Sequence, residues 1–380
     1  MSPAVPKLAL VLGGGGARAA YQAGFLHQLA REFPELNFPI LTGVSAGAIN
    51  AAFLANAHDP FPRATDQLES LWRGITVEQV FRSDFPALLK NMLHWALRLT
   101  TGGTRVAQPT RGLVDTAPLK HFLKHGYRTD SGLLHGIEAN LQSGRLSALG
   151  ITTTNYRTGQ SVTWVQGDNL ATWERAGRSS RHCVISVDHI LASCALPLFF
   201  PAIELGSDWH GDGGVRLTAP LSPALHLRAD RMLAISTLHR PAAPLPNGTA
   251  THGYPPPATV LGVVLDAVFL DMLDHDASTL ERINRLVRAS PSPAEPDLRP
   301  VELLMIRPSE DLGRIANECE PELPLAFRFA TRGLGTREAP RADLLATLLF
   351  QPRYINRLLA LGARDAAARR DEVAAFLQIK

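Results

Sequence analysis

The first 57 residues alternate between short apolar runs and longer segments with helical spacing. The runs at 7–12 (KLALVL) and 38–42 (FPILT) are short and largely apolar, which is typical of strands buried in a parallel sheet. Helix-like segments follow them at 18–32 and 46–57. Two consecutive strand–helix units predict an α/β fold with a mostly parallel central sheet flanked by helices.

The remaining pattern adds more strands and a largely helical end. Residues 147–167 predict two strands joined by the turn RTG, and 232–237 and 301–307 predict two further strands. Residues 258–289 and most of the chain after 340 have helical spacing. We therefore expect a helical C-terminal region after the α/β part.

The segment 85–103 (FPALLKNMLHWALRLTTGG) is amphipathic at helical spacing. One face is formed mainly by leucine, methionine and tryptophan, and the other carries Lys90, His94 and Arg98. Packing of the apolar face into the core is one explanation. The alternative is an interfacial helix within 85–99 that forms a lipid-facing cover near an active site.

Composition narrows the class of protein. With 45% hydrophobic and 19% charged residues, the 380-residue chain can build one large domain or a domain with an appended subdomain. A formal net charge of +3 only weakly favours anionic surfaces such as phospholipid headgroups and is far from a nucleic-acid-binding signature. No apolar run is long enough for a transmembrane helix, and the run after Lys7 is too short for a signal peptide. Three cysteines without metal-ligand spacing fit a reducing compartment.

The motif GVSAG (43–47) lies at the junction of the second predicted strand and its helix. A sharp strand-to-helix turn needs small neighbours, because a Cβ at Gly43 or Gly47 would clash with the strand or the helix. Such a turn projects the Ser45 hydroxyl out of the sheet, at the positive end of the helix dipole. The pattern suits a nucleophile; a turn that merely contains serine is the alternative.

The first strand ends in GGGGAR (13–18) and runs directly into a helix. Consecutive glycines leave backbone N–H groups uncovered, so an anion or a developing oxyanion can lie against them. A dinucleotide fingerprint lacks its third glycine, because Arg18 or Ala19 takes that position, and a Walker loop lacks its Gly-Lys-Ser/Thr end. An oxyanion hole needs only the N–H groups, and together with GVSAG it indicates acyl transfer.

A serine nucleophile needs a base to remove its proton. A Ser-His-Asp triad in the chain order serine, acid, histidine leaves His239, His252 and His275 as candidates, each of which could instead be a solvated surface histidine. The other candidate lies in GDGG (211–214), a tight turn that holds Asp212 between glycines. On its own, such an Asp-Gly sequence is usually only a turn.

Four segments resemble the patatin-like phospholipases, in the same order. GGGGAR with the nearby YQAG resembles that family's glycine-rich oxyanion block, and GVSAGAINA resembles its nucleophile elbow. ASCALPLFFP resembles the block before the catalytic aspartate, and DGG matches the Asp-Gly-Gly/Ala motif. These segments are residues 13–24, 43–51, 192–201 and 212–214, and the resemblance covers roughly 7–220. Ala19 stands where the family often has glycine and Cys194 where serine is common; neither touches the expected chemistry.

The resemblance implies a Ser-Asp dyad, with Ser45 as nucleophile, Asp212 as base and no catalytic histidine. The implied oxyanion donors are the backbone groups of Gly14, Gly15 and Gly16. The implied supporting residues are Arg18, Gly43, Gly47, Gly213 and Gly214. Arg18 would add positive charge or brace the loop by hydrogen bonds. A free aspartate is a weak base, and burial beside the serine would raise its pKa, because desolvation disfavours the charged form.

The implied architecture is a patatin-like α/β/α catalytic core at 7–220, with a mostly helical continuation at 221–380 that packs on it. The implied activity is hydrolysis of lipid esters, of phospholipase A type on glycerophospholipids, through an acyl-enzyme and without metal or cofactor. The alternatives are a Ser-His-Asp carboxylesterase and a non-catalytic protein that binds an anionic ligand on the same scaffold.

Partners and location follow from the same features. We expect a phospholipid or other lipid ester as substrate, peripheral contact with a membrane and no nucleic-acid partner. The expected location is the cytoplasm, with contact at the inner face of the membrane. The sequence does not specify an oligomeric state.

Overall fold

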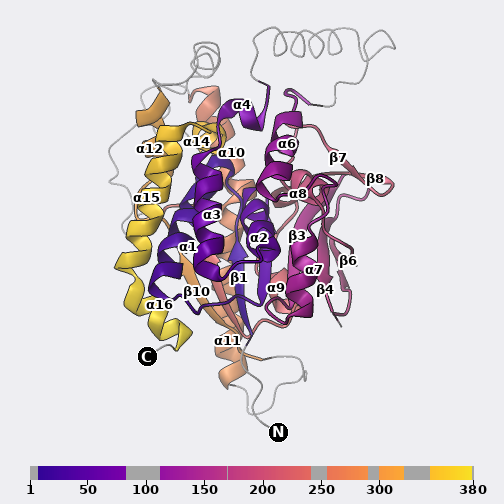
Figure 1. Cartoon of the computed structure of the whole chain (residues 1–380), viewed down its shortest axis with the longest axis vertical. Helices are drawn as coiled ribbons and strands as arrows, with labels where there is room; N and C mark the ends of the chain where they lie inside the picture. Colours follow the sequence, from indigo (N-terminus) through magenta and orange to yellow (C-terminus); the bar gives the residue numbers. More distant parts are fainter. Residues whose placement is uncertain are drawn as a thin grey trace.

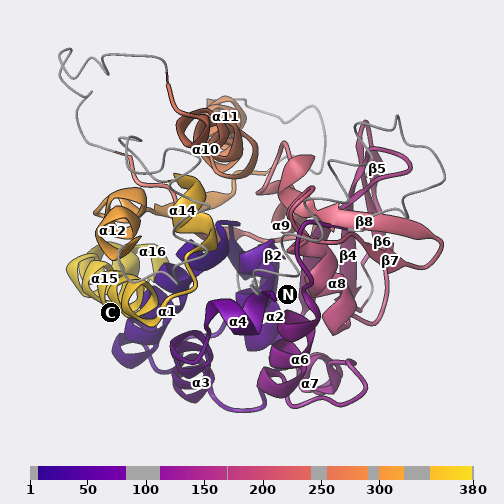
Figure 2. The same ribbon diagram turned by 90° about the horizontal axis from the view of Figure 1, so that it is seen from above.

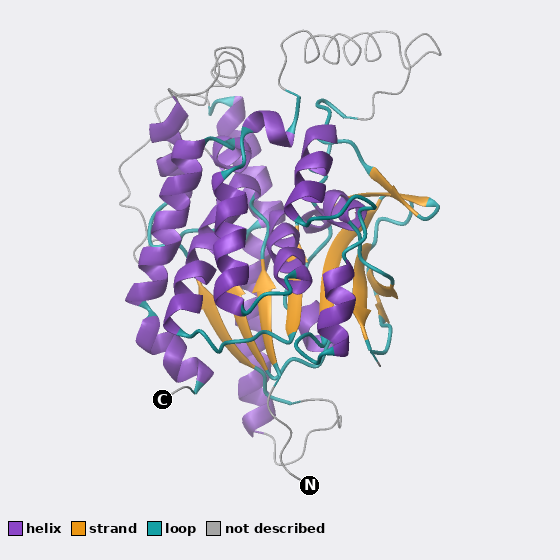
Figure 3. Cartoon of the chain, viewed as in Figure 1, coloured by secondary structure: helices purple, strands orange, loops and turns teal. Residues whose placement is uncertain are grey.

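The computed structural model describes residues 7–82, 112–168, 170–240, 255–289, 299–320 and 343–378. Within them, a ten-stranded sheet forms the middle layer and helices cover both of its faces (Figures 1, 2 and 3). The strands are β1 (Leu8–Leu12), β2 (Ile40–Val44), β3 (Ala148–Asn155), β4 (Ser161–Gly167), β5 (Glu174–Arg175), β6 (Arg178–His182), β7 (Ile203–Leu205), β8 (Asp208–Asp212), β9 (Arg231–Ile235) and β10 (Glu302–Ile306).

The centre of the sheet is parallel. Strands β10, β9, β1, β2 and β3 lie side by side in that order, and every neighbouring pair among them is parallel. Strands β1, β2 and β3 are almost fully buried, as expected for apolar strands covered by helices on both sides. The predicted mostly parallel α/β fold is confirmed, including the predicted strands near 232–237 and 301–307.

The helices account for most of the rest. They are η1 (Gly16–Ala19), α1 (Ala20–Glu32), α2 (Ala46–Asn56), α3 (Phe61–Arg73), α4 (Val77–Val80), α6 (Ala117–Gly126), α7 (His135–Gln142), α8 (Val187–Ser193), η2 (Gly213–Val215), α9 (Ser222–His226), α10 (Pro257–Phe269), α11 (Asp271–Ala289), α12 (Leu312–Cys319), α14 (Asp343–Leu348), α15 (Pro352–Ala368) and α16 (Arg370–Leu377). The predicted helical end of the chain is therefore confirmed. In the described part of the chain, no helix is long and apolar enough to cross a membrane.

The register of the strands brings two distant segments of the chain together at the end of β3. Val44, the last residue of β2, pairs with Thr152 of β3. The next residue of β3, Thr153, pairs with Asp212 of the antiparallel strand β8. Ser45 follows Val44 directly, and β4 occupies the other edge of β3, so β2 and β8 meet end to end along one edge and bring Ser45 and Asp212 together, although they are far apart in sequence.

The C-terminal helices are joined tightly to α1, just behind the glycine-rich loop. A Cβ at Gly24 would lie 2.1 Å from the Leu359 carbonyl oxygen, and a Cβ at Gly362 would lie 2.2 Å from that of Tyr21, so the backbones of α1 and α15 touch. The buried Tyr21 hydroxyl also donates to Asp365 at 3.0 Å. The boundary predicted at 220 stays a prediction; β9 and β10 extend the same sheet beyond it.

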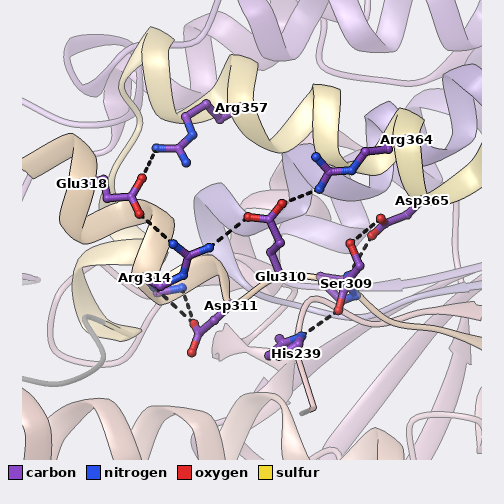
Figure 4. A network of polar contacts seen from close by, with 11 residues as sticks. His239, Ser309, Glu310, Asp311, Arg314, Glu318, Arg357, Arg364 and Asp365 are labelled. Atoms are coloured by element: carbon purple, nitrogen blue, oxygen red, sulfur yellow. Dashed lines mark hydrogen bonds and ion pairs between the residues drawn. The ribbon is translucent and has the colours of Figure 1, made fainter. Parts of the chain in front are cut away.

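Charged side chains connect α12, α15 and the loop after β10 (Figure 4). Arg314 pairs with Glu310 and Glu318, and these two acids also pair with Arg364 and Arg357. Most of these groups are exposed, so each pair contributes only about 0–1 kcal/mol to stability. The network therefore links α12, α15 and the loop after β10 but adds little to stability.

Candidate active site

Ser45 occupies a strained turn between β2 and α2. Its backbone has φ 53° and ψ −132°, a conformation that side-chain-bearing residues rarely adopt. The turn is tight because a Cβ at Gly47 would lie 2.3 Å from the Leu12 carbonyl oxygen, and one at Gly43 would lie 2.5 Å from that of Gly47. The steric clash expected for a side chain at either glycine matches this geometry.

Ser193 holds the backbone of the turn. The Ser45 N–H donates to Ser193 Oγ at 2.9 Å, and this hydroxyl donates to the Thr152 carbonyl at 2.7 Å. The single hydroxyl therefore connects the end of α8 to both β3 and the Ser45 turn. Ser193 was not among the site residues expected from the sequence, although it lies in the segment ASCALPLFFP beside Cys194.

Asp212 ends β8 and faces Ser45 in a buried environment. Its Oδ1 accepts a hydrogen bond from the Gly214 N–H at 2.8 Å. Burial raises the pKa of Asp212 to about 7, and the hydrogen bonds from the Ser45 side chain and from Gly214 hold that pKa below a still higher value. A Cβ at Gly213 would lie 2.1 Å from the Thr152 carbonyl oxygen, so this turn also needs glycine. The carboxyl can therefore gain and lose a proton near neutral pH.

The carbonyl groups of the glycine-rich loop are bonded to the surrounding protein. Gln22 donates to the Gly13 carbonyl at 2.9 Å, and Thr237 donates to the Gly14 carbonyl at 2.7 Å. Gly15 and Gly16 have φ values of 145° and 58°, which only glycine adopts readily. These two glycines line the same small cavity as Ser45 and Asp212, and a Cβ at Gly14 would lie 3.1 Å from that of Ser45. The loop thus presents its backbone to the serine side chain.

Arg18 is buried and paired with two acids from the C-terminal region. Its guanidinium lies 3.2 Å from Asp266 of α10 and 3.2 Å from Asp343 of α14, and it also donates to the Asp343 carbonyl at 2.6 Å. Burial raises the pKa of Asp266 above its usual range, and the positive charge of Arg18 opposes that rise. Of the two roles expected for Arg18, the geometry matches bracing of the loop.

The histidines considered from the sequence lie elsewhere. His239 Nδ1 is 2.9 Å from the Pro308 carbonyl and lies at the edge of the network in Figure 4. His275 is exposed on α11, and His252 lies outside the described residues. His210 is on β8, but its Nδ1 bonds to Thr153 and burial lowers its pKa to about 4. Within the described part of the chain, no histidine lines the cavity that holds Ser45 and Asp212.

This cavity is small and closed by C-terminal helices. Its volume is about 20 Å³. Its lining is Gly15, Gly16, Ser45, Leu196, Asp212, Leu265, Asp266, Phe269, Leu270 and Thr347. The chemistry-bearing groups therefore come from the first 212 residues, and most of the covering side chains come from α10 and the residue after it. The amphipathic segment 85–99, predicted as core packing or a cover, lies outside the described residues.

A comparison with protein-family profiles identifies one match. The profile described as patatin-like phospholipase matches residues 10–225, which is more than half of the chain. The comparison with curated proteins finds no match.

Several solved structures are similar over much of the chain. Human GIVD cytosolic phospholipase A2 in complex with methyl gamma-linolenyl fluorophosphonate is 14% identical, with a TM-score of 0.47, over 98% of this chain and 59% of that one. VipD from Legionella pneumophila is 12% identical, with a TM-score of 0.36, over 94% of this chain and 67% of that one. Full-length ExoU of Pseudomonas aeruginosa is 21% identical, with a TM-score of 0.27, over 61% of this chain and 44% of that one. The chain thus spans 59% of the first of these proteins.

Proposed function

The chain belongs to the patatin-like phospholipase family, and from this premise we propose that it hydrolyses lipid esters through a Ser45–Asp212 dyad. One observation carries the proposal: Ser45 lines the same small cavity as the buried Asp212 carboxyl, and burial raises the pKa of that carboxyl to about 7. A base whose pKa lies near the working pH is ionised in a large fraction of molecules and still binds a proton strongly enough to accept it from serine.

In the proposed reaction these groups act in sequence. The Ser45 oxygen attacks the ester carbonyl while its proton passes to Asp212. Backbone N–H groups of Gly14, Gly15 and Gly16 stabilise the negative oxygen of the tetrahedral intermediate. Such donors are typically worth about 2.7–4 kcal/mol each. The proton then passes to the leaving alcohol, and water, activated by the same carboxylate, releases the fatty acid from the acyl-enzyme.

The proposed substrate is a glycerophospholipid, cleaved as a phospholipase A would cleave it. The leaving group is then a lysophospholipid, and the proposed mechanism uses only this chain's own groups. The proposed location remains the one expected from the sequence: the cytoplasm, with peripheral contact at the inner face of the membrane.

Covalent labelling tests the dyad. A fluorophosphonate probe should modify Ser45, and mass spectrometry of the labelled peptide should place the adduct there. An adduct elsewhere on the folded, active protein would overturn the assignment. Product analysis on phospholipids with two different acyl chains, with Ser45→Ala as control, then tests the phospholipase A activity.

Two alternatives predict different results. A Ser-His-Asp esterase would lose activity when His239, His252 or His275 is replaced, whereas the dyad enzyme would retain it. A non-catalytic protein that binds an anion at 13–18 would not hydrolyse even a short p-nitrophenyl ester. Ser45 and Asp212 line one cavity that no described histidine lines, which favours the dyad over a histidine triad.

A further inference from the structure

Helix α10 closes the cavity beside Ser45 with its inner face. The Phe269 ring packs so closely on Gly214 that a Cβ there would lie 2.3 Å from it. Asp266, one turn earlier, lies 3.2 Å from Arg18. Phe269 also lines a second small cavity, which reaches Gly13 and Gly14 on the other side of the serine turn. The inner face of α10 therefore fills the space around the proposed nucleophile.

The space that remains is too small for the proposed substrate. Each of the two cavities that Phe269 lines has a volume of about 20 Å³. A cavity of this size holds about one water molecule. An ester with an acyl chain can reach Ser45 only when side chains around this cavity move, and most of those that cover it belong to α10 and Leu270.

The opposite face of α10 is apolar and exposed. Val260, Leu261, Val263 and Val264, which we call the outer face, are 48%, 42%, 64% and 51% exposed. The only ionisable residue of the helix is Asp266, and it points inward to Arg18. A helix that is apolar on all sides is normally buried in a protein core or in lipid.

The attachment of α10 differs from that of α11, the helix that follows it. In α11, Leu273, Ala277 and Leu280 are buried in a core cluster. No apolar side chain described in α10 is buried to that degree. Its inner face is held by the Arg18–Asp266 pair, by the packing of Phe269 and by contact with α14, where a Cβ at Gly262 would lie 3.4 Å from that of Asp343. α10 can therefore leave the site while α11 stays anchored.

We propose that α10 is a lipid-docking lid: its outer face enters the acyl-chain region of a membrane, and this docking withdraws Phe269 and Asp266 from the Ser45 cavity. The inference rests on the proposed function, because a lid of this kind is useful only if the substrate is a lipid ester. It assigns the lipid contact to a described helix and leaves the segment 85–99 as a separate prediction.

The choice of a lipid surface over a protein partner rests on charge and area. The outer face offers no charged group and no hydrogen-bonding side chain, which suits the hydrocarbon of a bilayer. Four half-exposed aliphatic side chains also provide far less surface than the about 800 Å² per partner that a stable protein interface buries. The inner side of the same helix contacts the proposed catalytic groups. A movement of α10 on docking therefore also opens the site.

Vesicle binding by an inactive variant tests the docking directly. The background is full-length Ser45→Ala, so that binding is measured without hydrolysis. The test variant adds Val260→Ser, Val263→Ser and Val264→Ser. The matched control instead adds Val184→Ser, Ile283→Ser and Leu286→Ser, three aliphatic residues that are 60%, 40% and 72% exposed elsewhere. Co-sedimentation uses phosphatidylcholine vesicles with and without phosphatidylglycerol, and circular dichroism checks folding.

The expected result is at least a tenfold weaker partition of the α10 variant, with the control within about twofold of its parent. Equal binding of both variants, or no vesicle binding by the parent, overturns the proposal. Loss of dimers instead of vesicle binding also overturns it, in favour of a second copy. Should the triple variant fold poorly, Val263→Glu alone applies the same test at the most exposed position.

A second measurement tests the opening step. A long-chain fluorophosphonate should label Ser45 at least fivefold faster when vesicles are present, and Phe269→Ala should remove that dependence by labelling fast without them. Labelling of Ser45 that is unaffected by vesicles overturns the lid but leaves the dyad intact. Vesicle binding through α10 without any labelling of Ser45 overturns the proposed function but leaves the docking intact.

Discussion

Helices α2 and α10 are both rich in apolar residues, and both lie beside Ser45, but their surroundings are opposite. In α2 (AGAINAAFLAN) nine of the eleven residues are buried. In α10 (PATVLGVVLDAVF) the outer face points to solvent. Figure 2 shows α2 enclosed between the sheet and other helices and α10 at the periphery. Both helices have the apolar composition of a buried helix. The difference in their exposure therefore comes from the elements that pack around each one.

The contrast divides the site into two parts. We call the Ser45 turn with α2 the fixed side and helix α10 the removable side. The serine turn ahead of α2 stores backbone strain, which persists only where packing over-determines the structure. Hydrogen bonds to Ser193 and close contacts at Gly47 provide that packing. On the α10 side, no apolar side chain described is fully buried, so less apolar packing is lost when the helix moves away. The chemistry is expected to depend on the first side and access on the second.

The largest expected effect is the loss of the base on the fixed side. Asp212→Asn should lower hydrolysis of a short soluble ester by at least about a hundredfold, because the amide cannot accept the Ser45 proton. Unchanged circular dichroism would show that the fold is intact. His239→Ala is the control and should retain activity. If Asp212→Asn retains activity, the chemistry does not reside in this dyad.

Much of the fixed side was predictable from sequence because its constraints are local. A serine between glycines at a strand–helix junction predicts the turn at Ser45, and the structure contains that turn. The segment that contains Asp212 was identified by its resemblance to a family motif. Pairing of Ser45 with Asp212 required the register of three strands, which no local pattern encodes. Ser193 was missed because its role depends on an atom of β3 that is 41 positions away.

The removable side was less predictable because its partners are distant. The helix over 258–289 was expected, but the Arg18 pairs join residues 248 and 325 positions apart. An all-apolar helix has no polar stripe to show which face is covered. The roles of Asp266 and Phe269 therefore depend on how the C-terminal region packs, and the sequence left that region without an interpretation beyond helices and strands.

A glycine on the fixed side should tolerate no side chain. In Gly47→Ala the new Cβ would lie 2.3 Å from the Leu12 carbonyl oxygen and 2.4 Å from that of Gly13, backbone atoms at the end of β1 and the start of the glycine-rich loop. Overpacking of this kind typically costs about 1–3 kcal/mol. Chemical denaturation should show the loss, accompanied by lower activity. A variant as stable and active as the parent would contradict the tight packing of the turn.

Because of the titration of Asp212, activity should rise with pH while the stability of the fold should fall. Asp212 must be ionised to act as the proposed base, so kcat/KM for a soluble ester should rise about tenfold from pH 6 to pH 8, given a pKa of about 7. The folded state holds this proton more tightly than the unfolded chain, because burial raises the pKa. The stabilising effect of the bound proton is therefore fully present below the ordinary aspartate pKa and is lost as pH rises through about 7.

Comparison with the amide variant isolates this group. Asp212→Asn cannot ionise, so its melting temperature relative to the parent should be higher at pH 8 than at pH 4. An activity profile that is flat between pH 6 and pH 8, or a melting difference of the opposite sign, would contradict the raised pKa of Asp212.

The smallest expected effect is at the matching glycine of α10. A Cβ at Gly262 would meet the Asp343 Cβ at 3.4 Å, which is close to ordinary van der Waals contact, and the residue lies inside a helix. Gly262→Ala should therefore stabilise the protein by about 0.5–1 kcal/mol, because alanine loses less backbone entropy in a helix. Denaturation midpoints of Gly47→Ala and Gly262→Ala, measured side by side, should move in opposite directions. If both glycines resist replacement equally, α10 is packed as rigidly as α2, and the distinction between a fixed and a removable side of the site fails.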